Sequence, residues 1–98
     1  MKAAELYRQR IVYAENKFAK LVLWRLRQPL ARSRHPYKYR LAYVVDEVCV
    51  LRYDNEAGKG DHRHWEAEED RYHFSTPEKL LADFQDDIEK WNDENSGS

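Results

Sequence analysis

Apolar and polar residues alternate along much of the first half of the chain, and this two-residue period is typical of β-strands with one buried face. The clearest run is 38–45, where tyrosine, leucine and valine fill every second position. The other predicted strands share β-branched and aromatic residues and cover 5–13, 18–26, 48–53 and 71–74. A helix stays open for the first of these, because the chain begins with good helix formers.

Polar and turn-forming residues separate these runs. Residues 27–37 form a basic loop, since they contain two prolines that cannot donate to a sheet ladder. Residues 46–47 are predicted as a tight turn, although they lack the glycine that hairpin turns prefer. Residues 54–64 hold two glycines and predict a longer loop, and the acidic stretch 66–70 is expected to be exposed.

The period changes to a helical one after residue 74. Ser75 or Thr76 can cap a helix, Pro77 fits its first turn, and Ser75 with Glu78 has capping-box spacing. The apolar residues that follow fall on one stripe and are Leu80, Leu81, Phe84, Ile88 and Trp91. Because this stripe needs a surface to cover, the sequence predicts an α+β fold: an antiparallel meander sheet of about five strands with one C-terminal helix packed on a face.

The length of 98 residues suits one domain and is too short for two. We expect a single domain over 1–91 and a disordered polar tail over 92–98. No run approaches the roughly 20 apolar residues that cross a bilayer, and the first residues lack a signal-peptide pattern. The single cysteine, Cys49, excludes an internal disulfide and is expected to be buried in its apolar run. These features predict a cytoplasmic protein without membrane contact.

Charge divides the chain into two unlike halves. Residues 1–45 carry eleven Lys and Arg against two Asp and Glu, whereas residues 46–98 carry six against sixteen. The net charge of −1 therefore conceals a basic half and an acidic half. This asymmetry predicts a basic face that suits nucleic acid and an acidic face that suits a basic partner or solvent.

The densest group of chemically capable side chains is the segment 53–64, YDNEAGKGDHRH. Gly58 and Gly60 let a ligand approach the main chain. Lys59 between them can hold a phosphate as a point charge, and Arg63 can offer it a planar fork. The remaining candidates in the segment are Tyr53, Asp54, Asn55 and Asp61. The spacing GxxxxGK[ST] of a P-loop is absent, so we expect a phosphate-binding segment of another kind.

His62 and His64 lie two positions apart. If this part of the chain is extended, both imidazoles project to one face and Arg63 projects to the other. Two histidines on one face permit acid–base catalysis, or metal binding with Asp54 or Asp61 as a third ligand. A polar loop that only joins two strands is the remaining interpretation.

Two further candidates lie outside this segment. Arg40 is on the polar face of the strand 38–45, where a fixed guanidinium can stabilise a charged phosphorus transition state. An ion pair with an acidic neighbour is the alternative role. Lys38 continues the basic loop, whose arginines and tyrosines suit single-stranded RNA through phosphate contacts and base stacking. A solvated loop with tyrosines packed on the sheet is the alternative there.

Three segments together resemble the TumE-like toxin family. They are KYRLAYV at 38–44, the YDN and GKGDHRH parts of 53–64, and LLADF at 80–84, and the likeness runs from about Lys2 to Trp91. Members of this family are the toxin components of bacterial and archaeal toxin–antitoxin systems. The resemblance implies growth inhibition by the free toxin and a cognate antitoxin, typically a small helix-turn-helix DNA-binding protein. It carries no established set of catalytic residues.

The leading hypothesis is a toxin that acts on RNA as a metal-independent endoribonuclease without a cofactor. His62 and His64 form the acid–base pair in this hypothesis. The other residues bind phosphate or orient a histidine, and they are Arg40, Lys59, Arg63, Asp54 and Asp61. The alternatives are a non-enzymatic toxin that blocks a nucleic-acid or translation target, and a metal-dependent nuclease. An enzyme requires the histidines and an aspartate to converge in a cleft, whereas a binding loop lets them splay. The oligomeric state stays open, a homodimer included.

Overall fold

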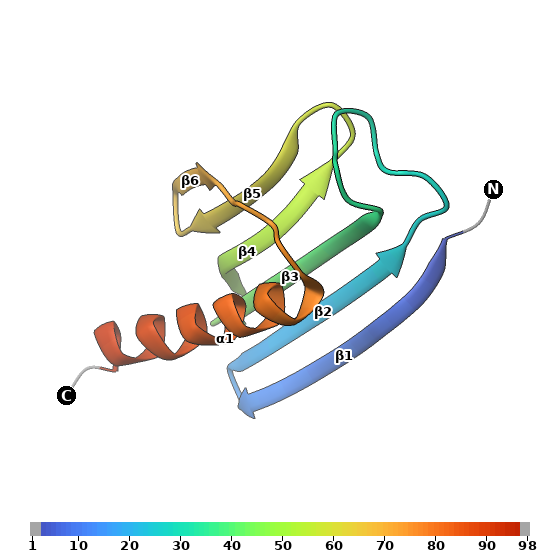
Figure 1. Ribbon diagram of the computed structural model, residues 1–98. Coiled ribbons are helices and arrows are strands. Elements are labelled where there is room, and N and C mark those ends of the chain that lie inside the picture. Colours follow the sequence, from blue (N-terminus) through green and yellow to red (C-terminus); the bar gives the residue numbers. More distant parts are fainter. Residues whose placement is uncertain (1–2, 97–98) are drawn as a thin grey trace.

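Six strands that follow one another along the chain form one antiparallel sheet, and a single helix lies across one of its faces (Figure 1). The computed structural model describes residues 3–96. The strands, in chain order and in sheet order, are β1 (Ala4–Ala14), β2 (Lys17–Arg25), β3 (Tyr37–Val45), β4 (Val48–Glu56), β5 (Gly60–Trp65) and β6 (Glu68–Arg71). The helix α1 (Pro77–Glu94) follows β6. The predicted α+β meander with one C-terminal helix is confirmed, with six strands in place of about five.

The segment 54–64 is largely strand, contrary to the loop predicted for it. β4 continues to Glu56 and β5 begins at Gly60, so only three residues connect them. Gly58 and Gly60 have φ of 80° and 82°, a left-handed conformation that glycine adopts without a steric penalty. The polar composition concealed the strand, because an alternation between two polar faces leaves no hydrophobic period to detect.

The last strand also differs from its prediction. The acidic residues Glu68–Arg71 form β6, while the predicted strand 71–74 has left the sheet after its first residue. Tyr72 and Phe74 are half-buried and pack against the core instead. Because β6 lies at the sheet edge with every residue exposed, charged side chains are tolerated there and protect the edge from pairing with another chain.

The helix begins as the sequence predicts. Thr76 is the N-cap and accepts a hydrogen bond from the backbone of Lys79, and Pro77 follows in the first turn. Four residues of the apolar stripe are buried, namely Leu80, Phe84, Ile88 and Trp91. They lie on a sheet face whose buried members come mainly from β2, β3 and β4, including Leu21, Leu41, Tyr43, Leu51 and Tyr53. Each such large apolar side chain contributes about 1.5–3 kcal/mol when fully buried.

The predicted tail at 92–98 overlaps the last helical turn. Asn92 accepts a hydrogen bond of 2.7 Å from the hydroxyl of Tyr43, which attaches this turn to the sheet. Residues 97 and 98 of the tail lie outside the described residues, as do residues 1 and 2 of the predicted domain. Within 3–96, no helix has the length and apolar character needed to cross a membrane.

Cys49 is exposed, although its apolar run predicted burial. A β-bulge between Tyr43 and Val44 interrupts the register with β4. As a result Val50 and Leu51 are both buried, and Cys49 moves to the face opposite the helix. A sequence period cannot reveal a bulge of this kind.

One charged contact joins the helix to the sheet beneath it. Asp87 is buried at 9% exposure, and its Oδ2 accepts hydrogen bonds from Arg63 Nε at 2.6 Å and from Tyr53 Oη at 2.7 Å. Burial and the carboxylate raise the pKa of Tyr53, and the hydrogen bond to Asp87 raises the pKa of Arg63. The same carboxylate therefore favours the charged form of Arg63 and the neutral form of Tyr53.

Replacing Asp87 by alanine is expected to lower the free energy of unfolding by about 1–3 kcal/mol, because it leaves a partly buried guanidinium without its partner. The neighbouring Asp86→Ala is the matched control, since Asp86 is exposed and its loss should change stability by less than about 0.5 kcal/mol. Urea-induced unfolding measures both. Equal effects of the two substitutions would contradict a special role for Asp87.

Candidate functional site

The pairing of β4 with β5 sets which side chains share a face. Asp54 lies opposite His62, and Arg52 lies opposite His64. Neighbouring residues of a strand point to opposite faces, and Arg63 points toward the helix. The side chains of Arg52, Asp54, His62 and His64 therefore all lie on the sheet face away from α1.

These side chains meet around one acidic residue that the sequence did not single out. Glu69 of β6 places its Oε2 3.2 Å from His62 Nδ1 and 3.5 Å from His64 Nε2. Asp54 Oδ1 is 3.9 Å from His64 Nε2, which is beyond hydrogen-bond reach. The histidines thus converge on a glutamate rather than on an aspartate. Glu69 lies close to the histidines because it pairs with His64 across β5 and β6. The sequence could not reveal this contact, because it predicted the last strand at 71–74 instead.

Arg52 is the second residue that sequence reasoning missed. Its Nη2 lies 3.1 Å from His64 Nε2 and its Nε lies 3.0 Å from Asp54 Oδ2. The Nε proton does not point at the carboxylate, so this buried nitrogen has an ionic contact but no hydrogen bond. The alternation of Arg52 with Tyr53 and Asp54 was the available signal, because it places Arg52 on the face of Asp54.

The two histidines have different surroundings, and this suits different roles in proton transfer. His62 Nε2 is 2.8 Å from the carbonyl of Lys59, and Nδ1 faces Glu69, so both ring nitrogens face oxygen acceptors. That arrangement suits a proton donor. His64 Nε2 faces Arg52, which is a donor in every protonation state. Toward Arg52 that nitrogen can only accept, which suits a general base, while the Glu69 carboxylate lies further from it, at 3.5 Å. These roles are inferred from the partners of each ring.

The four side chains line an open hollow of about 460 Å³. Its other lining residues are Glu56, Lys59 and Glu69. We call this surface the histidine hollow. Lys59 extends over its rim with its side chain 73% exposed and its Nζ 3.5 Å from Glu56. Arg40 lies beside the hollow, because it pairs with Asp54 across β3 and β4.

Tyr53, Asn55 and Arg63 lie on the helix side of the sheet. Tyr53 and Arg63 are bound to Asp87, as described above. Asn55, at 2% exposure, accepts from the backbone of Tyr39 and donates to the carbonyl of Tyr37, so it replaces part of the ladder between β3 and β4. Lys38 lies on the outward face of β3, where its Nζ donates to the carbonyl of Asn55. The structure does not bring these side chains to the histidine hollow.

Asp61 has its own set of partners. Its Oδ2 accepts from Tyr39 Oη at 2.5 Å and from His35 Nε2 at 2.9 Å. His35 Nδ1 accepts from the backbone of Tyr37, so neither ring nitrogen of His35 is free. The ring stacks on Phe74 with 3.9 Å between centroids. This cluster fastens the basic loop to the sheet.

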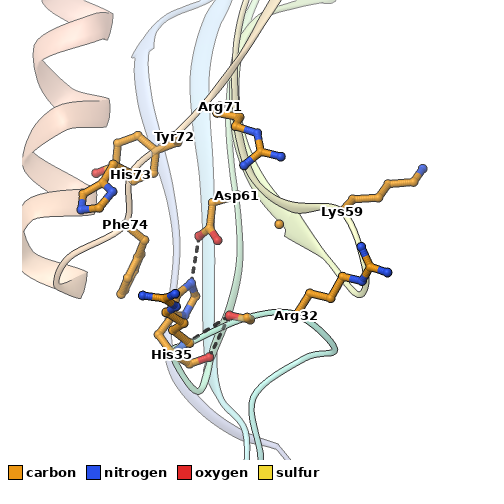
Figure 2. Close-up of a pocket in the computed structure, with 11 residues that line it drawn as sticks. Arg32, His35, Lys59, Asp61, Arg71, Tyr72, His73 and Phe74 are labelled. Atoms are coloured by element: carbon orange, nitrogen blue, oxygen red, sulfur yellow. Dashed lines mark hydrogen bonds and ion pairs between the residues drawn. The ribbon is translucent and has the colours of Figure 1, made fainter.

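A second hollow of about 360 Å³ opens beside this cluster. Figure 2 shows Arg32, Lys59 and Arg71 around its mouth, with Asp61 between them and His35 against Phe74. Lys59 lines both hollows, so the turn between β4 and β5 separates them. Within residues 3–96, no three His, Cys, Asp or Glu side chains come together in a way that could hold a metal ion.

Comparison with known proteins gives one finding. The family model described as "Toxin TumE" matches residues 3–92, which is nearly the whole chain. No curated protein and no solved structure matches it.

The tyrosines around the acidic residues predict a loss of stability in alkali. Burial, followed by a hydrogen bond to a carboxylate, raises the pKa of Tyr39, Tyr53 and Tyr72. In the unfolded chain these hydroxyls titrate near pH 10, so the unfolded state loses protons first. Their stabilising contribution is full below about pH 10 and is lost as the pH rises further. Tyrosinate absorbance should show three tyrosines that ionise only as circular dichroism reports unfolding. Full ionisation of all seven tyrosines in a folded chain would contradict this.

Proposed function

The chain belongs to the TumE toxin family, and on that premise we propose that the free toxin cleaves RNA by acid–base catalysis in the histidine hollow, without a metal ion. As a member of this family it is the toxin component of a toxin–antitoxin pair, and the family implies an antitoxin partner. The observation that supports the proposed reaction is the pair of histidines in one hollow, with His64 Nε2 against a guanidinium and both ring nitrogens of His62 against oxygen acceptors.

The reaction needs only groups present in the hollow and in RNA. His64 Nε2 takes the proton of a 2′-hydroxyl, and the 2′-oxygen forms a bond to the adjacent phosphorus. The bond from phosphorus to the 5′-oxygen of the next nucleotide breaks, and His62 gives its proton to that oxygen. The products are a 2′,3′-cyclic phosphate and a free 5′-hydroxyl. The two histidines end with exchanged protonation states, which water restores.

The negative charge that develops on phosphorus needs fixed cations. Arg52 is the best placed, because it already contacts both His64 and Asp54. When RNA binds, the guanidinium of Arg52 donates to a phosphate oxygen and leaves His64 Nε2 free for the 2′-hydroxyl. Lys59 at the rim and Arg40 beside the hollow hold flanking phosphates. Arg63 supports the helix and takes no part in this step.

The acidic residues of the hollow act as positioning residues in this proposal. Glu69 contacts both imidazoles, and Asp54 holds Arg52. The proposed partner is the helix-turn-helix antitoxin that the resemblance implies. To inhibit the toxin, this antitoxin must cover or distort the histidine hollow. Co-purification with the gene neighbour tests that partner.

Purified toxin should cleave RNA in EDTA and leave cyclic-phosphate ends. His62→Ala or His64→Ala should each reduce the rate by about 10²–10⁴-fold, which is the usual contribution of a positioned acid or base. His73→Ala is the matched control, because His73 is exposed and lines the other hollow, and its rate should stay unchanged.

Three outcomes separate the alternatives. Equal cleavage of RNA by the toxin and by a double variant with both His62→Ala and His64→Ala would remove the histidines from the mechanism. Cleavage that EDTA abolishes and Mg²⁺ restores would indicate a metal-dependent nuclease. Growth arrest that persists in cells expressing the double variant, with no RNA cleaved, would indicate a toxin that blocks its target by binding.

A further inference from the structure

The sheet face away from the helix continues from the histidine hollow across β3, β2 and β1. Leu21, Leu41 and Tyr53 are paired neighbours with buried side chains on the helix side, so the alternate positions face outward. The outward residues of β2 and β3 are Phe18, Lys20, Val22, Trp24, Lys38, Arg40, Ala42 and Val44. None of these eight is acidic. We call this surface the outer sheet face.

A hollow of about 320 Å³ lies on the outer sheet face. Its floor is apolar and consists of Val22, Ala42 and Val44, with Phe18 at one side. Its rim carries three cations and the only thiol of the chain, which belong to Arg8, Lys20, Arg40 and Cys49. The aromatic ring of Phe18 also has the guanidinium of Arg10 4.4 Å above its centroid.

The cations on this rim are available to a ligand. Lys20 and Arg40 have no ion pair with any residue between 3 and 96, and both are exposed. Arg8 pairs only with Glu5 at the open surface, a contact of little energy that a phosphate can replace. An apolar floor inside a cationic rim fits a nucleobase with its phosphates, because single-stranded nucleic acids bind through base stacking and backbone charge together.

This face runs without interruption into the histidine hollow. Lys20 pairs with Ala42, which pairs with Arg52, which pairs with His64. The three strand spacings from β2 to β5 span about 14 Å, a distance that a few nucleotides bridge. The helix on the opposite face is acidic, with exposed Glu78, Asp86, Glu89 and Asp93, and would repel the same ligand.

We propose that the outer sheet face, together with Arg8 of β1, is the binding surface for single-stranded RNA, with a base on the floor of Val22, Ala42 and Val44 and phosphates on Arg8, Lys20 and Arg40. This proposal deepens the ribonuclease function and rests on it, since it names the path by which the substrate reaches His62 and His64.

Alkylation of Cys49 can report whether a ligand occupies the hollow on the outer sheet face, because Cys49 lines that hollow. A mixed-sequence 2′-O-methyl oligoribonucleotide of about ten nucleotides cannot be cleaved through its 2′-oxygen, so it measures binding separately from catalysis. It should protect Cys49 from alkylation by iodoacetamide, and the protection should weaken steeply as salt rises. Fluorescence anisotropy of the same oligonucleotide gives the dissociation constant.

Two variants with the same charge change on opposite faces test the location. Lys20→Glu should raise the dissociation constant about tenfold or more, whereas Lys90→Glu on the exposed side of α1 should change it less than about twofold. Lys20→Gln, which keeps the strand free of a new charge, should show a smaller loss in the same direction and serves if Lys20→Glu fails to fold.

Each outcome decides the proposal. Protection of Cys49 together with the Lys20 effect supports the outer sheet face, even if the chain cleaves no RNA and the ribonuclease function fails. Binding without protection, or equal weakening by Lys20→Glu and Lys90→Glu, overturns the face while leaving cleavage intact. Protection of Cys49 by purified antitoxin but by no oligonucleotide also overturns it and assigns the face to the protein partner.

Discussion

The contact between Arg63 and Asp87 fixes which face of β5 points at the helix, and the candidate chemistry depends on that choice. A shift of one residue in the pairing of β4 and β5 would exchange the faces of every side chain in the strand. Because a charged guanidinium is held 2.6 Å from a buried carboxylate of α1, such a shift would separate a partly buried ion pair. This contact thereby keeps His62 and His64, the sequence neighbours of Arg63, on the outer face. A residue with no place in the proposed reaction thus determines where the reaction can occur.

The basic loop depends on a second, half-buried carboxylate, that of Asp61. This carboxylate binds Tyr39 of β3 and His35 of the loop, and the backbone of Gly58 in the turn donates a hydrogen bond to the carbonyl of Ala31 in the loop. The turn between β4 and β5 is consequently held from both sides. Lys59 at its tip lies between two hollows on a fixed support, which is the arrangement that precise phosphate binding requires.

The sequence was informative where one physical signal dominated. The strand 38–45 has one fully buried face, and the helix start has both a capping residue and a proline, so both could be predicted. The segment 54–64 could not, because its strands are polar on the outer face and its inner residues Asn55, Asp61 and Arg63 are polar too. Their burial is made possible by partners such as Tyr39 and Asp87, which are distant in sequence. Composition identified the candidate segment, but it could not separate residues that serve the histidine hollow from those that support the fold.

Tertiary structure also changes the meaning of the net charge. A value of −1 suggests no attraction to RNA, yet the fold places the exposed acidic side chains of α1 and the cations of the outer sheet face on opposite layers. The acidic exposed side of α1 and the basic outer sheet face are separated by the helix and the sheet, and a helix alone is about 10–12 Å thick. Charges at that distance are largely screened at physiological ionic strength, where the Debye length is about 8 Å. An approaching phosphate therefore experiences the cations of the nearer layer, and the potential of that face, rather than the sum over the chain, governs association.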